Sequence, residues 1–174
     1  MKKLIIAVMT ILAFTFVAFG QKTKTVKVDQ TKAVRAAFDR LIEGIKQADS
    51  GKVMSVYEKS DRTLFFNNNG SATIGWENMK TIRENLYAKT TNVTIETTGL
   101  RIEILSPNSA YVSCKWIQKQ EYEEKVENAS GRMTLVFKLI EKDWKIVHAH
   151  TSPDTTKPDK TYLESERNMK DNNL

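Results

Sequence analysis

The sequence has few of the residues that cross-link or stiffen a chain: one cysteine, three prolines and seven glycines in 174 residues. A single cysteine, Cys114, cannot form an internal disulfide, and three prolines are too few for a proline-rich linker protein. Hydrophobic residues make up 40% of the chain and charged residues 28%, a composition typical of folded globular proteins. Composition and length together predict one globular domain.

Long apolar runs are also scarce, because only residues 4–19 form one. Two lysines precede this run, and Ala18 and Gly20 are small residues at the two positions that a signal peptidase reads. A membrane anchor is the alternative, but the run is shorter than the roughly 20 residues of a membrane-spanning helix. We therefore expect a signal peptide over residues 1–20 and a secreted or periplasmic protein without a stable membrane span.

Several signatures of catalysis and binding are missing as well. Basic residues are scattered among acidic ones, so the net charge of +6 forms no basic stripe with interleaved aromatics. Two histidines and one cysteine do not complete a recognisable zinc-ligand set. There is no Gly-x-Ser-x-Gly elbow and no phosphate-binding glycine loop. We expect no metal, no cofactor and no nucleic-acid partner.

Hydrophobic periodicity predicts helices in the first half of the chain. After a flexible leader over residues 21–30, apolar residues recur at spacings of three and four over residues 31–48. Ser50-Gly51 is expected to end this helix, and residues 52–57 form a second, short one. After a strand at residues 63–67, a third helix is expected beyond Gly75, with one apolar side carrying Met79, Ile82 and Leu86.

The periodicity changes to two after Asn92, which predicts strands. These strands are expected within residues 93–105, 110–116, 133–139 and 144–151. Helices followed by an antiparallel meander predict an α+β domain over residues 31–153. The remaining residues, 154–174, form a polar tail with a candidate peripheral helix.

The last hairpin predicts the orientation of both histidines. A turn at Lys142-Asp143 places Phe137 opposite His148 and Leu135 opposite His150. Side chains directly opposite one another share a face of the sheet, so both imidazoles are predicted to point inward. There they act as acid and base, hold a ligand, or are structural core residues bonded to the backbone.

The opposite face of these strands combines charged residues with apolar ones. We expect this outer face to form a homodimer interface. The alternative is a solvated face with isolated apolar residues. The apolar residues assigned to it are Ile117, Val136, Val147 and Ala149.

Three segments together resemble the SnoaL-like branch of the nuclear transport factor 2-like superfamily. They are the helix with Phe38, Leu41, Ile42 and Ile45, the segment Gly70–Met79 that runs into a helix, and the ending Trp144-Lys-Ile-Val-His-Ala-His-Thr-Ser152. The ending is also similar to that of the calcium/calmodulin-dependent kinase association domain. The resemblance implies a cone-shaped, curved antiparallel sheet packed against helices, with a cavity between them. It also implies a dimer, and a choice among isomerases, dehydratases, cyclases and assembly modules.

Our first hypothesis is an exported binding or assembly module without committed catalysis. Its cavity holds a small apolar or weakly acidic ligand. Tyr57, Phe66 and Trp116 form the walls, while His148 and His150 form the polar end.

The alternative is an isomerase-, dehydratase- or hydrolase-type enzyme with His148 or His150 as general base. Ketosteroid isomerase-type members of the superfamily use an inward carboxylate instead. Here Asp61 lies in a charged loop that we expect to be exposed, and the inward faces carry no Asp or Glu, which weakens proton abstraction at carbon. A third possibility is a structural dimer whose cavity has collapsed.

Overall fold

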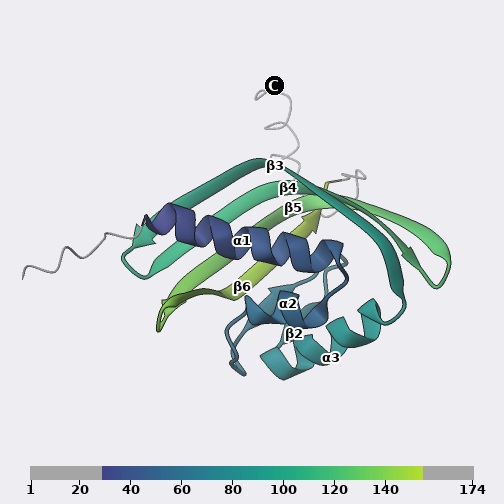
Figure 1. The fold of residues 1–174 in the computed structure, drawn as a ribbon, viewed down its shortest axis with the longest axis horizontal. Coiled ribbons are helices and arrows are strands. Elements are labelled where there is room, and N and C mark those ends of the chain that lie inside the picture. Colours follow the sequence, from purple (N-terminus) through teal and green to yellow (C-terminus); the bar gives the residue numbers. More distant parts are fainter. Residues whose placement is uncertain (1–28, 155–174) are drawn as a thin grey trace, which may run out of the picture.

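The computed structural model describes residues 29–154 (Figure 1). The predicted signal peptide, nearly all of the predicted leader and the tail from residue 155 lie outside the described residues. In chain order the elements are α1 (Gln30–Lys46), α2 (Ser50–Ser55), β1 (Leu64–Phe66), β2 (Ala72–Ile74), α3 (Trp76–Tyr87), β3 (Thr90–Ser106), β4 (Ser109–Tyr122), β5 (Lys125–Ile140) and β6 (Asp143–Pro153). The predicted α+β class is confirmed. Within residues 29–154, no helix has both the length and the apolar character to cross a membrane.

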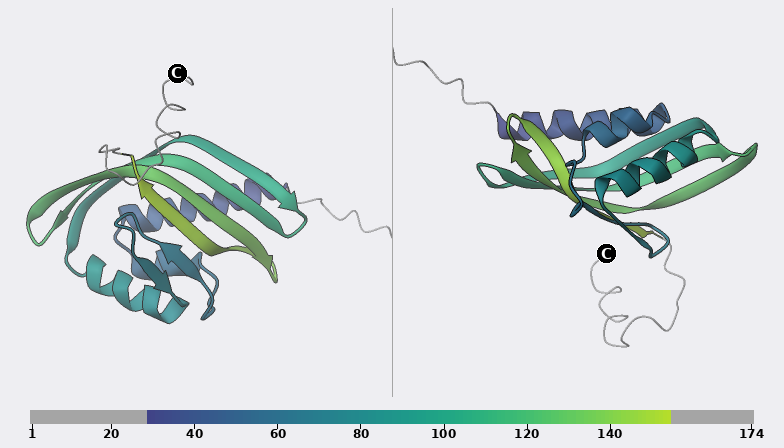
Figure 2. Two further views of the ribbon diagram at one scale, coloured as in Figure 1. Left: turned by 180° about the vertical axis from the view of Figure 1, so that it is seen from behind. Right: turned by 90° about the horizontal axis from the view of Figure 1, so that it is seen from below.

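The six strands form one curved sheet in the order β2-β1-β6-β5-β4-β3. Neighbouring strands are antiparallel as predicted, except that β1 pairs with β6 in parallel. α1 crosses one side of the sheet, in front of β3 to β6 in Figure 1 and behind them in the left view of Figure 2. We call this helix-covered side the inner face and the opposite side the outer face.

α1 forms because it is capped and has one apolar side. The side chain of Asp29 accepts a hydrogen bond from the Lys32 backbone N–H at 3.3 Å, which satisfies one free donor of the first turn. Ser50-Gly51 does not separate the two helices as predicted but begins α2, because Asp49 caps that helix through the Lys52 N–H at 2.8 Å. The buried side of α1 consists of Val34, Ala37, Phe38, Leu41 and Gly44.

β4 and β5 are much longer than predicted. They continue through polar residues, in unbroken register, to a turn at Glu123 and Glu124, where φ is 48° and 64°. Three irregularities in register between β3 and β4, one of them at Gly99 with φ of 62°, add twist and bend to the sheet. The hairpin of β4 and β5 extends beyond the helices at the right of Figure 1.

β6 begins with the predicted orientation of its side chains. The turn lies at Glu141-Lys142, one residue earlier than expected, and Phe137 pairs with Ile146. Trp144 and Ile146 therefore face inward and are buried, as predicted.

Beyond Ile146 a β-bulge at Val147 reverses the prediction. The register shifts by one, so that His148 pairs with Val136 and Ala149 pairs with Leu135. A shift of one residue exchanges the two faces of a strand. The predicted inward orientation of His148 and His150 is therefore wrong, and Ala149, assigned to the outer face, is fully buried on the inner one.

The bulge lies where β6 changes its neighbour. Before it, Ile146 exchanges backbone hydrogen bonds with Val56 and Glu58, at 2.8 and 2.9 Å. After it, His148 is the first residue that pairs with β1. One extra residue adapts the same strand to both neighbours.

Gly131 on β5 has no room for a side chain. A Cβ at this position would collide with the backbone oxygen of Ser152 and lie 3.1 Å from the Asn68 side-chain oxygen. A Cβ on Gly51, in α2, would approach only the Asp49 carboxylate, at 3.3 Å.

We predict that Gly131→Ala lowers the free energy of unfolding by about 1–3 kcal/mol, because β5 and β6 must separate locally. Gly51→Ala is the matched control and should change stability by less than about 1 kcal/mol, because alanine favours the helix. Urea denaturation of the two variants measures both effects. Equal midpoints for Gly131→Ala and the wild type would contradict the steric argument.

Candidate functional site

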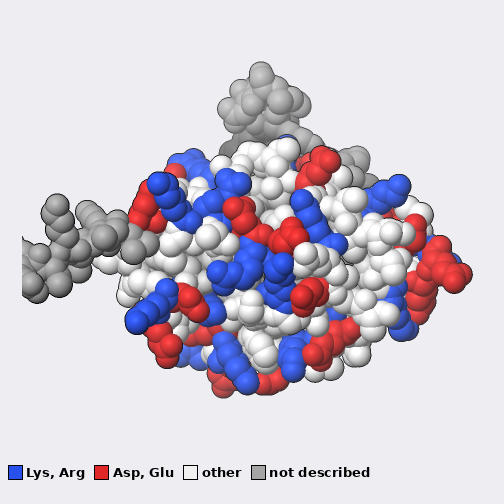
Figure 3. Space-filling view, viewed as in Figure 1, with Lys and Arg blue, Asp and Glu red and all other residues white. Residues whose placement is uncertain are grey.

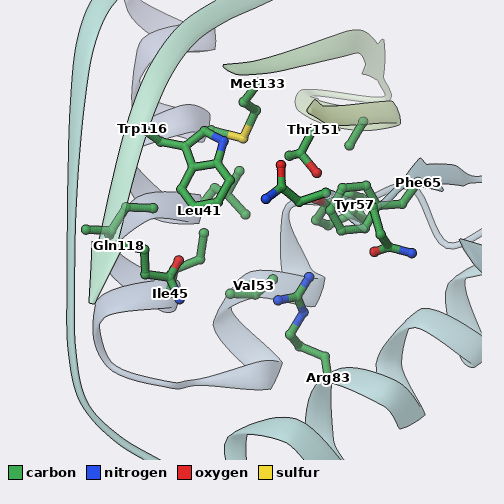
Figure 4. Close-up of a pocket in the computed structure, with 14 residues that line it drawn as sticks. Leu41, Ile45, Val53, Tyr57, Phe65, Arg83, Trp116, Gln118, Met133 and Thr151 are labelled. Atoms are coloured by element: carbon green, nitrogen blue, oxygen red, sulfur yellow. The ribbon is translucent and has the colours of Figure 1, made fainter. Parts of the chain in front are cut away.

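A cavity of about 200 Å³ lies on the inner face, between the sheet and all three helices (Figure 4). Its walls are mostly apolar, and its polar side chains come from Tyr57 after α2, the turn after β1, α3, β4 and β6. The lining residues are Leu41, Ile45, Val53, Tyr57, Phe65, Asn67, Asn68, Arg83, Ile95, Trp116, Gln118, Met133, Ala149 and Thr151.

Two of the five predicted ligand residues lie in this cavity. Tyr57 follows α2 and Trp116 is on β4; both are buried and line the walls. In Figure 4 they face each other across the open centre, with Met133 beside Trp116 and Phe65 beside Tyr57. Their contribution to binding remains a prediction, but their position agrees with it.

The other three predicted ligand residues lie outside the cavity. Phe66 is 41% exposed, and its ring meets His148 and His150 edge-on, with ring centroids 5.6 and 5.7 Å apart. On the outer face, Phe66 pairs in register with His150, and His148 pairs with Leu64. The neighbouring Phe65 lines the cavity in place of Phe66, because successive side chains of a strand point to opposite faces.

Arg83 is the charged residue of the cavity wall, and sequence reasoning missed it. It is half-buried, and its guanidinium lies 5.9 Å from the Phe65 ring centroid and 5.5 Å from that of Tyr87. Figure 4 shows it reaching from α3 toward the cavity centre. Arg83 takes part in none of the ion pairs among residues 29–154.

The sequence of α3 contains a helical pattern that places Arg83 on the buried side of the helix. We predicted an apolar side with Met79, Ile82 and Leu86, but Ile82 is 49% exposed. The buried residues of α3 are Met79 and Tyr87, and Arg83 lies midway between them at a spacing of four. A cation on the buried side of a helix is the signal that was present in the sequence.

Two buried polar atoms of the cavity residues have no partner within the described part of the chain. They are the Trp116 indole N–H and the Asn68 side-chain oxygen. Trp116 pairs with Gly131 on the neighbouring strand, and the Asn68 oxygen lies 3.1 Å from where a Cβ on the same glycine would be. An unpaired buried polar group costs about 1–3 kcal/mol, so both atoms favour an occupant that can pair with them.

Tyr57 adds a neutral donor to the cavity wall. Burial raises the pKa of its hydroxyl to about 12, although the positive charge of Arg83 acts to lower it. Burial also raises the pKa of the Tyr87 hydroxyl, which Arg83 again lowers in part. Both phenols stay protonated at neutral pH and can donate hydrogen bonds.

Within the described part of the chain, the cavity wall holds no side chain that takes up a proton at neutral pH. None of the lining residues from 29–154 is Asp, Glu or His. Asp61 is exposed in its loop, as predicted. Cys114 is buried, and burial raises the pKa of its thiol to about 11, so it is an inert thiol at neutral pH. Residues 29–154 hold no cluster of three or more His, Cys, Asp or Glu side chains suited to a metal ion.

The fold defines the class of protein. Helices packed on the inner face of a curved sheet, with a cavity between them, characterise the nuclear transport factor 2-like superfamily. The SnoaL-like domain family matches residues 34–155, and this chain belongs to that family. The resemblance seen in the sequence is thus confirmed.

Solved structures share the fold at low sequence identity. A nuclear transport factor 2-like superfamily protein from Salmonella enterica serovar Typhimurium has a TM-score of 0.65 and 22% identity, covering 76% of this chain and 96% of its own. A protein of unknown function from Shewanella oneidensis scores 0.57 at 20% identity, covering 71% and 98%. A ketosteroid isomerase-like protein from Erwinia carotovora scores 0.63 at 14% identity, covering 74% and 99%. No curated protein matches the sequence.

The pKa of Tyr57 leads to a prediction about alkaline stability. The folded-state pKa lies above the ordinary value of 10.0, so the folded protein holds this proton more tightly than the unfolded chain. The associated stabilisation is complete below pH 10 and is lost as the pH rises through about 12. At high pH the loss amounts to about 2–3 kcal/mol.

Tyr57→Phe should remove that loss. Relative to the wild type, we expect the variant to gain stability between about pH 9 and pH 12, measured by guanidinium unfolding. Tyr111→Phe, on the outer face, is the control. A wild-type and Tyr57→Phe difference that stays constant with pH would show that the hydroxyl is not desolvated.

Proposed function

We propose that this protein is an exported small-molecule-binding module whose ligand occupies the cavity between the helices and the sheet. The observation that supports it most is the combination of apolar walls with two buried polar atoms, of lining residues, that have no partner within residues 29–154. Ligand sites commonly combine apolar walls with a few convergent polar groups. An engineered apolar cavity of about 150 Å³ accepts benzene, so about 200 Å³ suits a ring with one or two substituents.

The enzyme alternative has less support. His148 and His150 lie on the outer face, separated from the cavity by the sheet, so neither meets a cavity-bound substrate as general base. Among residues 29–154, the cavity wall supplies hydrogen-bond donors and one cation, but no Asp, Glu or His that could act as general base. Ligand binding requires only apolar walls and a few hydrogen-bonding groups, and the cavity has both.

Native mass spectrometry tests the proposal on the mature chain, produced by export and purified gently. N-terminal sequencing of the same sample establishes whether cleavage precedes Gln21. A small added mass that disappears on denaturation supports a resident ligand. A protein that carries no adduct and binds no member of a small aromatic library contradicts the proposal.

Ile45→Trp should weaken binding by filling the cavity from α1. Ile45 is half-buried and lines the cavity, whereas Ile42 is half-buried on the same helix and packs elsewhere on the core. We expect Ile45→Trp to reduce adduct occupancy or ligand affinity about tenfold or more, as steric exclusion implies. Ile42→Trp is the matched control, and equal losses in the two variants would indicate general destabilisation instead.

We also propose that a second copy of the chain covers the outer face. Of the residues predicted for this interface, Ile117 is exposed there, and Val136 and Val147 are half-buried. Ala149 is no longer part of the proposed interface, because its side chain is buried on the inner face. Strand pairing places a row of apolar and aromatic side chains across five strands, flanked by charges of both signs that suit a two-fold interface. The row is Ile74, Leu64, His148, Val136 and Tyr111.

Val136→Glu, at the centre of this row, should convert a dimer into a monomer, because a carboxylate would be buried without a partner in an apolar interface. Ala36→Glu, on the exposed side of α1, should leave the dimer intact. Light scattering coupled to size exclusion measures the mass of each. A monomeric wild type, or a dimeric Val136→Glu, would refute this interface.

A further inference from the structure

We infer that the ligand of this cavity is a small aromatic carboxylate whose acid group binds Arg83 and whose far end carries a hydrogen-bonding group such as a hydroxyl. The inference rests on the proposed binding function and adds the chemical class of the ligand.

Charge is the first reason. Arg83 is the one charged residue among those that line the cavity, and no lining carboxylate balances it. The nearby acids of α3 have other partners: Glu77 pairs with Lys59 at 3.3 Å and Glu84 with Lys80 at 3.6 Å. A half-buried cation without a counter-ion attracts an anion from solution, and low local polarity strengthens that attraction.

The shape of the guanidinium is the second reason. Arg83 lies beside two aromatic rings, Phe65 and Tyr87, at distances where cation–π attraction holds it in place. A planar guanidinium binds a carboxylate through two parallel hydrogen bonds. These groups match a flat carboxylate better than a neutral acceptor.

The walls determine the body of the ligand. Side chains from α1, α2, β3 and β5 present only carbon and one sulfur atom to the cavity centre: Leu41, Ile45, Val53, Ile95 and Met133. A cavity of about 200 Å³ with such walls accommodates one ring, which also stacks or packs well beside an indole.

The unpartnered atoms near Gly131 determine the other end. The Trp116 indole N–H is a donor and the Asn68 side-chain oxygen is an acceptor. A hydroxyl group can accept from a donor or donate to an acceptor, so it suits either atom. Because Arg83 is on α3 and Trp116 is on β4, across the centre in Figure 4, an acid and a hydroxyl at opposite ends of a ring meet both sites.

The experiment compares two compounds of nearly equal size, 4-hydroxybenzoate and 4-hydroxybenzyl alcohol, by titration calorimetry on the mature protein. We expect the carboxylate to bind at least about tenfold more tightly, as a charge-assisted pair implies. Its affinity should fall with added salt, whereas that of the alcohol should not. Equal affinities would overturn the inference and leave the binding cavity standing, while no binding of either compound or of the wider library would also refute the proposed function.

Arg83→Met separates a specific role from a structural one. This variant should lose at least about tenfold in affinity for 4-hydroxybenzoate while its weak affinity for the alcohol persists. Arg40→Met, on the exposed side of α1, is the matched control and should bind like the wild type. If Arg83→Met fails to fold, the salt dependence of the wild-type protein still decides the question. Unchanged affinity in a folded Arg83→Met would overturn the inference.

Discussion

The geometry of the site depends on β6, because this one strand forms hydrogen bonds with two different neighbouring segments. Its first half pairs with the segment after α2 and its second half pairs with β1, and the bulge at Val147 joins the two registers. Without the extra residue, the two imidazoles would face the helices and Ala149 would face out. With it, small and hydroxyl side chains, Ala149 and Thr151, turn inward and leave space for a cavity.

The same reversal divides the molecule into two chemically distinct sides. The inner side gathers apolar walls, protonated donors and one arginine. The outer side carries Phe66 with both histidines, the apolar row across five strands and exposed charges. On the helix-covered side, acidic and basic residues are interleaved across the solvent surface (Figure 3). The positive charge that matters for binding is therefore that of the half-buried Arg83 in the cavity wall.

The course of the backbone was largely predictable from the sequence, because apolar periodicity follows burial directly. The three helices, the change to strands after Asn92 and the position of the last hairpin were predicted within a few residues. The polar extension of β4 and β5 was not, since its strands are stabilised by hydrogen bonding to each other, with little apolar burial to produce a pattern. The parallel pairing of β1 with β6 was missed because three residues carry almost no positional signal.

The candidate site was predictable only in part, for a related reason. Tyr57 was placed correctly because it belongs to an apolar helical pattern, and Trp116 because it lies in a regularly alternating strand. His148 and His150 were misplaced because alternation in β6 is interrupted by a bulge that depends on its neighbours in space. Phe66 was misplaced because a three-residue strand does not reveal which of Phe65 and Phe66 faces inward. Arg83 was missed because a search for apolar stripes passes over a cation on the buried side of a helix.

The parallel pair of β1 and β6 also has a consequence for the order of folding. β1 lies in the first half of the chain, yet its parallel partner β6 is the last strand within residues 29–154. The wall formed by Phe65, Ala149 and Thr151 cannot close until the C-terminal strand is available, and closing so long a loop is slow relative to forming a hairpin. The cavity is therefore expected to be among the last features of the fold to form.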